Sequence, residues 1–166
     1  MGMGEPLAAE LKQEAATTRR LLERVPEDKF SWKPHEKSMT LGRLASHLAE
    51  LPALLVNALT ADEIDFASGN YKPFTASSVE ELLEKFDANI SEGVEQLKGT
   101  ADERMFDTWR MRRGEQVMFE LPRVAVVRGV VLNHVIHHRG QLSVYLRLLD
   151  VPLPSIYGPT ADAPMF

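Results

Sequence analysis

The sequence predicts an all-α protein folded as a four-helix bundle, on three observations. Four segments repeat apolar residues at the three- and four-residue spacing of a helix. Between the third and fourth of these segments, a short stretch lacks the helical spacing, so little of the chain is left to form strands. The 166 residues suit one domain with its own core, so residues 1–166 are expected to form a single bundle domain.

The first two predicted helices are separated by a loop that contains two prolines. The first helix spans about residues 7–24. The second begins near Ser38 or Thr40, both residue types that are favoured at a helix N-cap. Pro52 lies inside the second helix and cannot donate a backbone hydrogen bond, so we expect a bend or an early end one turn beyond His47.

The third predicted helix begins at a capping box. Residues 77–81 read Ser-Ser-Val-Glu-Glu, which fits the Ser-x-x-Glu pattern in either register, and Gly99 is a favourable residue for the helix end. Beyond it, segments 108–111 and 116–119 around Gly114 are expected to pair as a short hairpin.

The fourth predicted helix has the clearest pattern. It opens at Pro122, a favoured first helical residue, and runs to about Leu149. Residues 150–166 contain four prolines and are expected to lie along the bundle surface without forming a helix. Residues 61–76, between the second and third helices, are expected to form a loop.

Composition excludes several classes of function. The net charge of −5 argues against binding to a nucleic-acid backbone, and no apolar run is long enough to span a membrane. The N-terminus lacks the apolar region of a secretory signal. The absence of cysteine excludes disulfides, thiolate metal sites and a cysteine nucleophile. We therefore expect a cytoplasmic protein.

Three of the five histidines fall on the fourth predicted helix. At about 100° per residue, His134 and His138 lie on its apolar stripe, one turn apart, whereas His137 lies at the edge. The stripe also includes Leu148, and Arg139 falls outside it. Two imidazoles one turn apart are able to bind one ion at about 2.1 Å.

A third metal ligand must come from another helix. His47 lies on the leucine-rich face of the second helix, so we expect it to point inward as well. The competing interpretation is that each of these histidines is an ordinary hydrogen-bonded core residue. His137 is expected to contact a ligand histidine, another helix or another subunit, and loop residue His35 is given no role.

Three stretches of the sequence resemble the DinB-like family, and the likeness covers essentially the whole chain. Residues 40–50 read Thr-Leu-Gly-Arg-Leu-Ala-Ser-His-Leu-Ala-Glu, and residues 134–142 read His-Val-Ile-His-His-Arg-Gly-Gln-Leu. The third, at 151–162, reads Val-Pro-Leu-Pro-Ser-Ile-Tyr-Gly-Pro-Thr-Ala-Asp. The resemblance implies up-down-down-up helices with a long crossover between the second and third, and a homodimer. It also implies a zinc or nickel site on His47, His134 and His138.

The resemblance leaves the reaction open. Some relatives are labelled metal-dependent hydrolases, and others are S-transferases that use bacillithiol, mycothiol or glutathione. We expect a hydrolase acting on a small molecule; the alternatives are a thiol-dependent S-transferase and a dimeric metal-binding module without turnover. A metal on three imidazoles leaves coordination positions open and lowers the pKa of bound water towards about 7, or keeps a bound thiolate ionised.

A few further residues are candidates for the neighbourhood of the metal. Glu50 is a weak candidate for a general base, and Gln141 is a weak candidate for a hydrogen bond to a ligand histidine or to substrate. Tyr157 and Asp162 either contact the site or hold the tail in place. Five arginines are candidates for binding the carboxylates of a thiol cofactor: Arg43, Arg110, Arg112, Arg113 and Arg139.

Overall fold

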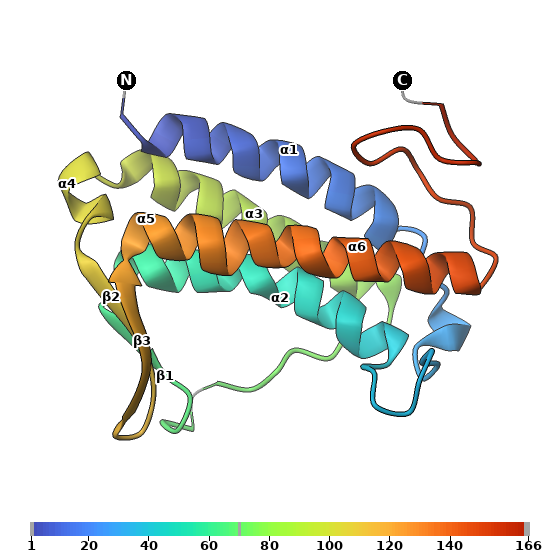
Figure 1. The fold of residues 1–166 in the computed structure, drawn as a ribbon, viewed down its shortest axis with the longest axis horizontal. Coiled ribbons are helices and arrows are strands. Elements are labelled where there is room, and N and C mark those ends of the chain that lie inside the picture. Colours follow the sequence, from blue (N-terminus) through green and yellow to red (C-terminus); the bar gives the residue numbers. More distant parts are fainter. Residues whose placement is uncertain (1, 70, 165–166) are drawn as a thin grey trace.

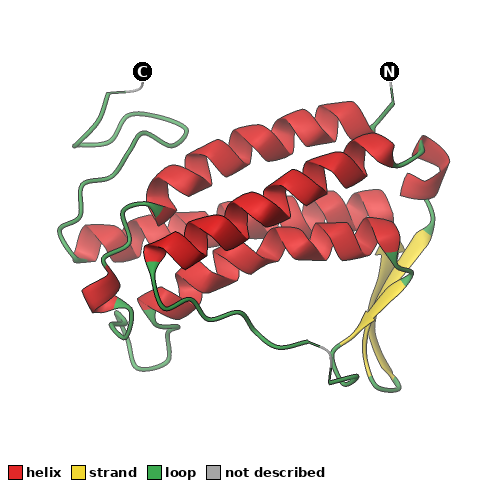
Figure 2. Cartoon of the chain, turned by 180° about the vertical axis from the view of Figure 1, so that it is seen from behind, coloured by secondary structure: helices red, strands yellow, loops and turns green. Residues whose placement is uncertain are grey.

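Four long helices lie side by side in the computed structural model, which describes residues 2–69 and 71–164. They are α1 (Gly4–Leu22), α2 (Leu41–Thr60), α3 (Val79–Gly99) and α6 (Asn133–Leu148). In Figure 1, α1 and α6 run in one direction, and α2 and α3 run in the other. The segment between α2 and α3 crosses the length of the bundle to allow this order (Figure 2).

The helix starts follow the predicted capping chemistry. The Thr40 hydroxyl accepts a hydrogen bond from the backbone N–H of Arg43 at the start of α2. At the start of α3, the Ser78 hydroxyl accepts from the N–H of Glu81. The expected early end of α2 is wrong, since the helix continues past Pro52 to Thr60. Pro52 is buried, and the packing of the helix around it outweighs the lost hydrogen bond.

A small mixed sheet corrects the purely all-α prediction. Strands β2 (Thr108–Arg113) and β3 (Gln116–Pro122) form the predicted hairpin, with Gly114 at a positive φ of 60° in its turn. Strand β1 (Glu63–Asp65) pairs in parallel with β2 and was predicted as loop. Three residues are too few to show a strand period, so only the tertiary fold reveals β1.

The predicted fourth helix is divided into three parts. It begins as α5 (Arg123–Ala125), widens into a π-helix over Val126–Leu132, and continues as α6. Two of the wheel assignments are wrong: Leu148 is 58% exposed, and Arg139 is only 1% exposed. Leu148 is the last residue of α6, and Arg139 faces α1, so the buried surface of α6 is wider than the predicted stripe.

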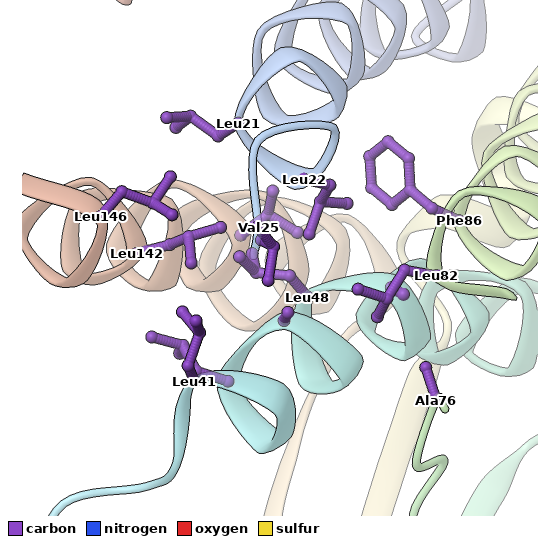
Figure 3. Packing of buried hydrophobic residues seen from close by; sticks show 14 of the residues in the cluster. Leu21, Leu22, Val25, Leu41, Leu48, Ala76, Leu82, Phe86, Leu142 and Leu146 are labelled. Carbon is purple, nitrogen blue, oxygen red and sulfur yellow. The ribbon is translucent and has the colours of Figure 1, made fainter. Parts of the chain in front are cut away.

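The main core lies between the long helices. Leu48 of α2, Leu82 and Phe86 of α3, and Leu142 and Leu146 of α6 belong to its largest cluster (Figure 3). Residues on α1 and from the loop after it close this cluster, so all four helices bury apolar faces against each other. Two short helices, η1 (Glu27–Lys29) and α4 (Asp102–Met105), connect the larger elements.

The proline-rich tail lies against α1 and α6, as expected. Arg24 on the loop after α1 donates to the carbonyl of Pro152, and Arg147 of α6 pairs with Asp162. In the described residues, no helix has the length and apolar character needed to cross a membrane.

Candidate metal site

Three histidines from two helices meet at one side of the bundle. His47 lies on α2, and His134 and His138 lie one turn apart on α6. Each offers one ring nitrogen, and these nitrogens all lie within 4.8 Å of one another. The ring centroids are 4.6 to 5.2 Å apart. The structure therefore brings together the three residues that the sequence singled out.

The remaining ring nitrogen of each histidine is held by a protein acceptor. Nδ1 of His47 lies 3.0 Å from a Glu50 oxygen, and Nδ1 of His138 lies 2.6 Å from the side-chain oxygen of Gln141. The side chain of His134 makes a hydrogen bond to the backbone of Val130. In the tautomers whose outward nitrogens donate to these oxygens, the inward-facing nitrogens carry the lone pairs that a cation needs.

This arrangement of protons fits a cation. Nε2 of His134 lies 2.8 Å from Nε2 of His138. Without an ion, one of these nitrogens has to donate its proton to the other at this distance, whereas a shared positive ion accepts the lone pairs of both. Histidines that bind metals usually donate their other ring N–H to a carboxylate, an amide or a backbone carbonyl, and these are the three kinds of group that the histidines contact here.

The local electrostatics keep two of these imidazoles neutral. Burial first, and then the neighbouring histidines, lower the pKa of His134. Burial also lowers the pKa of His138, to about 4, despite the opposing bond to Gln141. Neutral imidazole is the form that binds a metal, so both residues are available as ligands near pH 7.

Glu50 connects the histidine cluster to the crossover segment. Its carboxylate accepts hydrogen bonds from His47, Arg43, the Tyr71 hydroxyl and the backbone N–H of Phe74. Burial alone would raise the pKa of Glu50, but the bonds from His47, Arg43 and Phe74 outweigh it and hold that pKa at about 2. A carboxylate with four donors and so low a pKa suits holding His47 in place better than accepting a proton.

The other predicted polar residues lie outside the cluster. His137 is exposed and makes an edge contact with the ring of His138, 4.9 Å between centroids. Tyr157 donates to Glu14 on α1, and Asp162 pairs with Arg147, so both hold the tail in place.

The candidate arginines are mostly engaged by carboxylates. Arg139 is buried against Glu14, and Arg112 pairs with both Glu63 and Asp65. Arg113 is exposed. Four of the five candidates have an acidic partner: Arg43, Arg110, Arg112 and Arg139. They are therefore poorly placed to bind the carboxylates of a cofactor.

A cavity of about 630 Å³ opens beside the histidines and includes His47 and His134 in its wall. Other parts of the wall come from the crossover segment and from the hairpin. Four aromatic residues of this wall were not predicted from the sequence: Phe66, Tyr71, Phe74 and Phe119. None lies on a long helix, so no periodic pattern pointed to them.

Comparisons with known proteins agree on one family. The family model for the DinB family matches residues 3–164. The uncharacterized protein YrdA of Bacillus subtilis (strain 168) is 25% identical over 154 residues, covering 90% of this chain and 84% of that protein.

Two solved structures share the fold. A DinB-like protein from Bacillus cereus ATCC 10987 superimposes with a TM-score of 0.70 at 20% identity, over 91% of this chain and 95% of that one. The DinB-like protein YjoA from Bacillus subtilis gives a TM-score of 0.65 at 19% identity, over 87% and 92% of the two chains. At these identities the structures support the fold alone.

Proposed function

This chain belongs to the DinB family, and on that premise we propose that it is a divalent-metal protein whose ion is held by His47, His134 and His138. The observation that carries the proposal is the convergence of three imidazoles whose outward nitrogens are already bound to protein acceptors. Zinc and nickel both suit an all-imidazole protein shell.

We propose further that the protein is a hydrolase acting on a small molecule. Three protein ligands leave coordination positions free, which is typical of catalytic sites rather than structural ones. A divalent ion at such a site lowers the pKa of a water or thiol that it binds. His47 and His134 line the adjacent cavity, so a substrate held there lies next to the ligand histidines. In this proposal Glu50 and Gln141 orient His47 and His138.

The metal proposal is tested by the metal content of untagged protein purified without chelators. We expect about one equivalent in the wild type and a large loss in His47→Ala and His138→Ala. The exposed histidines supply matched controls, because His35→Ala and His137→Ala should retain the wild-type content. A metal-free wild type would contradict the proposal.

The hydrolase proposal is tested with ester, amide and phosphate substrates. We expect at least one class to be turned over by the metal-loaded wild type and to lose most of its rate in His134→Ala. Rates that are insensitive to this substitution for all three classes would exclude hydrolysis at this site. A protein that keeps its metal and fails every assay is the non-catalytic module.

Thiol-dependent S-transfer is the second candidate, and the state of Glu50 favours it. Within the described residues, this carboxylate is the acidic group bonded to the cluster, and its four donors leave it poorly suited to act as a base. A thiol ionised by a metal attacks an electrophile without a separate base. An electrophile panel with each low-molecular-weight thiol added in turn is the test, and rates independent of thiol would exclude transfer.

Homodimerisation belongs to the proposal as well. We expect light scattering of the purified protein to give twice the mass of the chain. A monomer mass at working concentration would contradict this part without affecting the metal site.

A further inference from the structure

The cavity beside the histidines has apolar walls. Its lining includes Leu54, Ile64, Phe66, Phe74, Met111 and Phe119. Its volume of about 630 Å³ falls within the range of roughly 300–1,000 Å³ that is usual for small-molecule sites. Burial of an apolar ligand surface against such walls is favourable before the costs of association. The walls thus match a molecule with a substantial apolar body.

The charged residues of the same lining differ in how they are paired. Glu50 is neutralised by Arg43 and by three further hydrogen bonds. Lys72 and Lys85 also line the cavity, both are exposed, and neither makes an ion pair among residues 2–69 and 71–164. The cavity therefore presents two positive charges to a ligand without a compensating negative charge of the protein.

The lysines and the histidines come from different elements of the fold. Lys85 lies on α3 and Lys72 on the crossover segment, whereas His134 lies on α6. Helix α2 packs against both α3 and α6, and residues of α2 contribute to the lining of the cavity. A ligand in the cavity therefore has apolar side chains of α2 beside it. The imidazoles of its wall come from α2 and α6, and the ammonium groups come from α3 and the crossover segment.

We infer that the cavity binds a small carboxylic acid with an apolar, aromatic-sized body, its carboxylate at Lys72 and Lys85 and its reactive polar group at the histidines. This substrate class rests on the proposed metal function for its chemistry, but the charge preference depends on the lysines alone. Exposed ion pairs are individually weak, so the two lysines together predict a preference for the acid over a neutral analogue of roughly five- to tenfold.

The test compares 1-naphthylacetate with 1-naphthylacetamide, which share a ring system and differ in charge. Binding of both to the metal-loaded protein is measured by titration calorimetry, in the wild type and in the Lys72→Glu/Lys85→Glu double variant. We expect the wild type to prefer the acid by roughly five- to tenfold and the double variant to bind the two equally or to prefer the amide. Lys12→Glu changes an exposed lysine of α1 outside the cavity and should keep the wild-type preference.

Two outcomes overturn the inference. Equal binding of acid and amide by the wild type removes the charge preference, and a preference that persists in the double variant places the carboxylate elsewhere, including on the metal. Lys72→Gln/Lys85→Gln repeats the test without charge reversal and should also lose the preference. Metal content of the same samples is measured separately: a metal-free protein that retains the preference contradicts only the proposed function, and a metal-loaded protein without it contradicts only this inference.

Discussion

Two polar clusters lie on different faces of α6, and two consecutive residues of this helix belong to different clusters. His138 joins His47 and His134 on the side of α2. Arg139, the next residue, joins Glu14 of α1 and the tail. The two side chains have similar burial, since His138 is 8% exposed and Arg139 is 1% exposed. Burial of a polar residue therefore does not by itself distinguish a binding site from a structural contact.

The difference lies in whether the cluster supplies its own cation, even though Nη2 of Arg139 is buried without a hydrogen-bond partner among the described residues. Arg139 donates to the Glu14 carboxylate at 2.6 Å, Tyr157 donates to the same carboxylate at 2.7 Å, and the guanidinium lies 4.7 Å from the Tyr157 ring. One positive and one negative charge balance there. The histidine cluster instead has its outward nitrogens against protein oxygens, which leaves its inward nitrogens able to share a cation. The first cluster is therefore a structural contact, whereas the second could hold the external cation that we propose.

Among the tests of this contrast, substitution of Arg139 is expected to give the largest change in the free energy of unfolding. Arg139→Met leaves the 9%-exposed Glu14 side chain without its cation, and breaking a buried pair in this way lowers the free energy of unfolding by about 3–5 kcal/mol. Urea denaturation of metal-free protein measures it. Arg128→Met removes a half-exposed arginine from its pair with Glu10 and should cost less than about 1 kcal/mol. Equal losses in the two variants would show that the Arg139 cluster is not a stabilising unit.

The histidine cluster should respond to metal instead. Free metal at 100 times its dissociation constant is expected to raise the free energy of unfolding by about 2.7 kcal/mol, because the ion binds the folded state. Denaturation with and without zinc or nickel measures this gain. His138→Ala should abolish the gain, and His137→Ala should retain it because His137 lies outside the three converging nitrogens. A gain that survives in His138→Ala would place the ion elsewhere.

A smaller change in metal affinity is expected at Glu50. Glu50→Gln keeps the shape of the side chain but removes the charge that holds His47, and loss of such a partner typically weakens metal binding about 10- to 100-fold. Competition with a chelator of known affinity measures the change. Glu95→Gln on the exposed surface of α3 is the control and should be neutral. An unchanged affinity in Glu50→Gln would mean that His47 is oriented by packing alone.

The two clusters also differ in how far the sequence predicts them. His134 and His138 are one turn apart on a helix, and His47 lies on an apolar helix face, so periodicity alone selects these residues. The burial of Arg139 depends on Glu14, about 125 positions earlier, and on the tail, which no local pattern encodes. The assumption of 100° per residue also fails in the π-helix that precedes α6.

The fold shows the same limit. The long helices and the hairpin have their own local signals, namely caps, apolar period and turn glycine. Strand β1 and the aromatic cavity wall arise only where the crossover segment meets α2 and the hairpin. Their positions follow from tertiary packing, so the sequence predicts the histidine cluster better than it predicts the cavity beside it.

The smallest effect is expected at the outer part of the tail, where Asp162 accepts hydrogen bonds from Arg147 and from the N–H of Leu153. The Arg147 bond first, and the Leu153 bond second, lower the pKa of Asp162. A carboxyl with a lowered folded-state pKa stabilises the fold above its unfolded value of about 3.9, and this contribution is lost as the pH falls through the folded value. Asp162→Asn removes the ionised carboxylate, so it should remove the same stabilising contribution at pH 7.

Hydrogen exchange of a peptide covering residues 150–164 measures this change at pH 7. We expect severalfold faster exchange in Asp162→Asn than in the wild type, while the control Asp28→Asn, in an exposed pair with Lys29, should exchange as the wild type does. Metal content should be the same in all three proteins, because the tail contacts α1 and α6 on the side of Arg139. Loss of metal in Asp162→Asn would show instead that the two clusters on α6 are coupled through the helix that separates them.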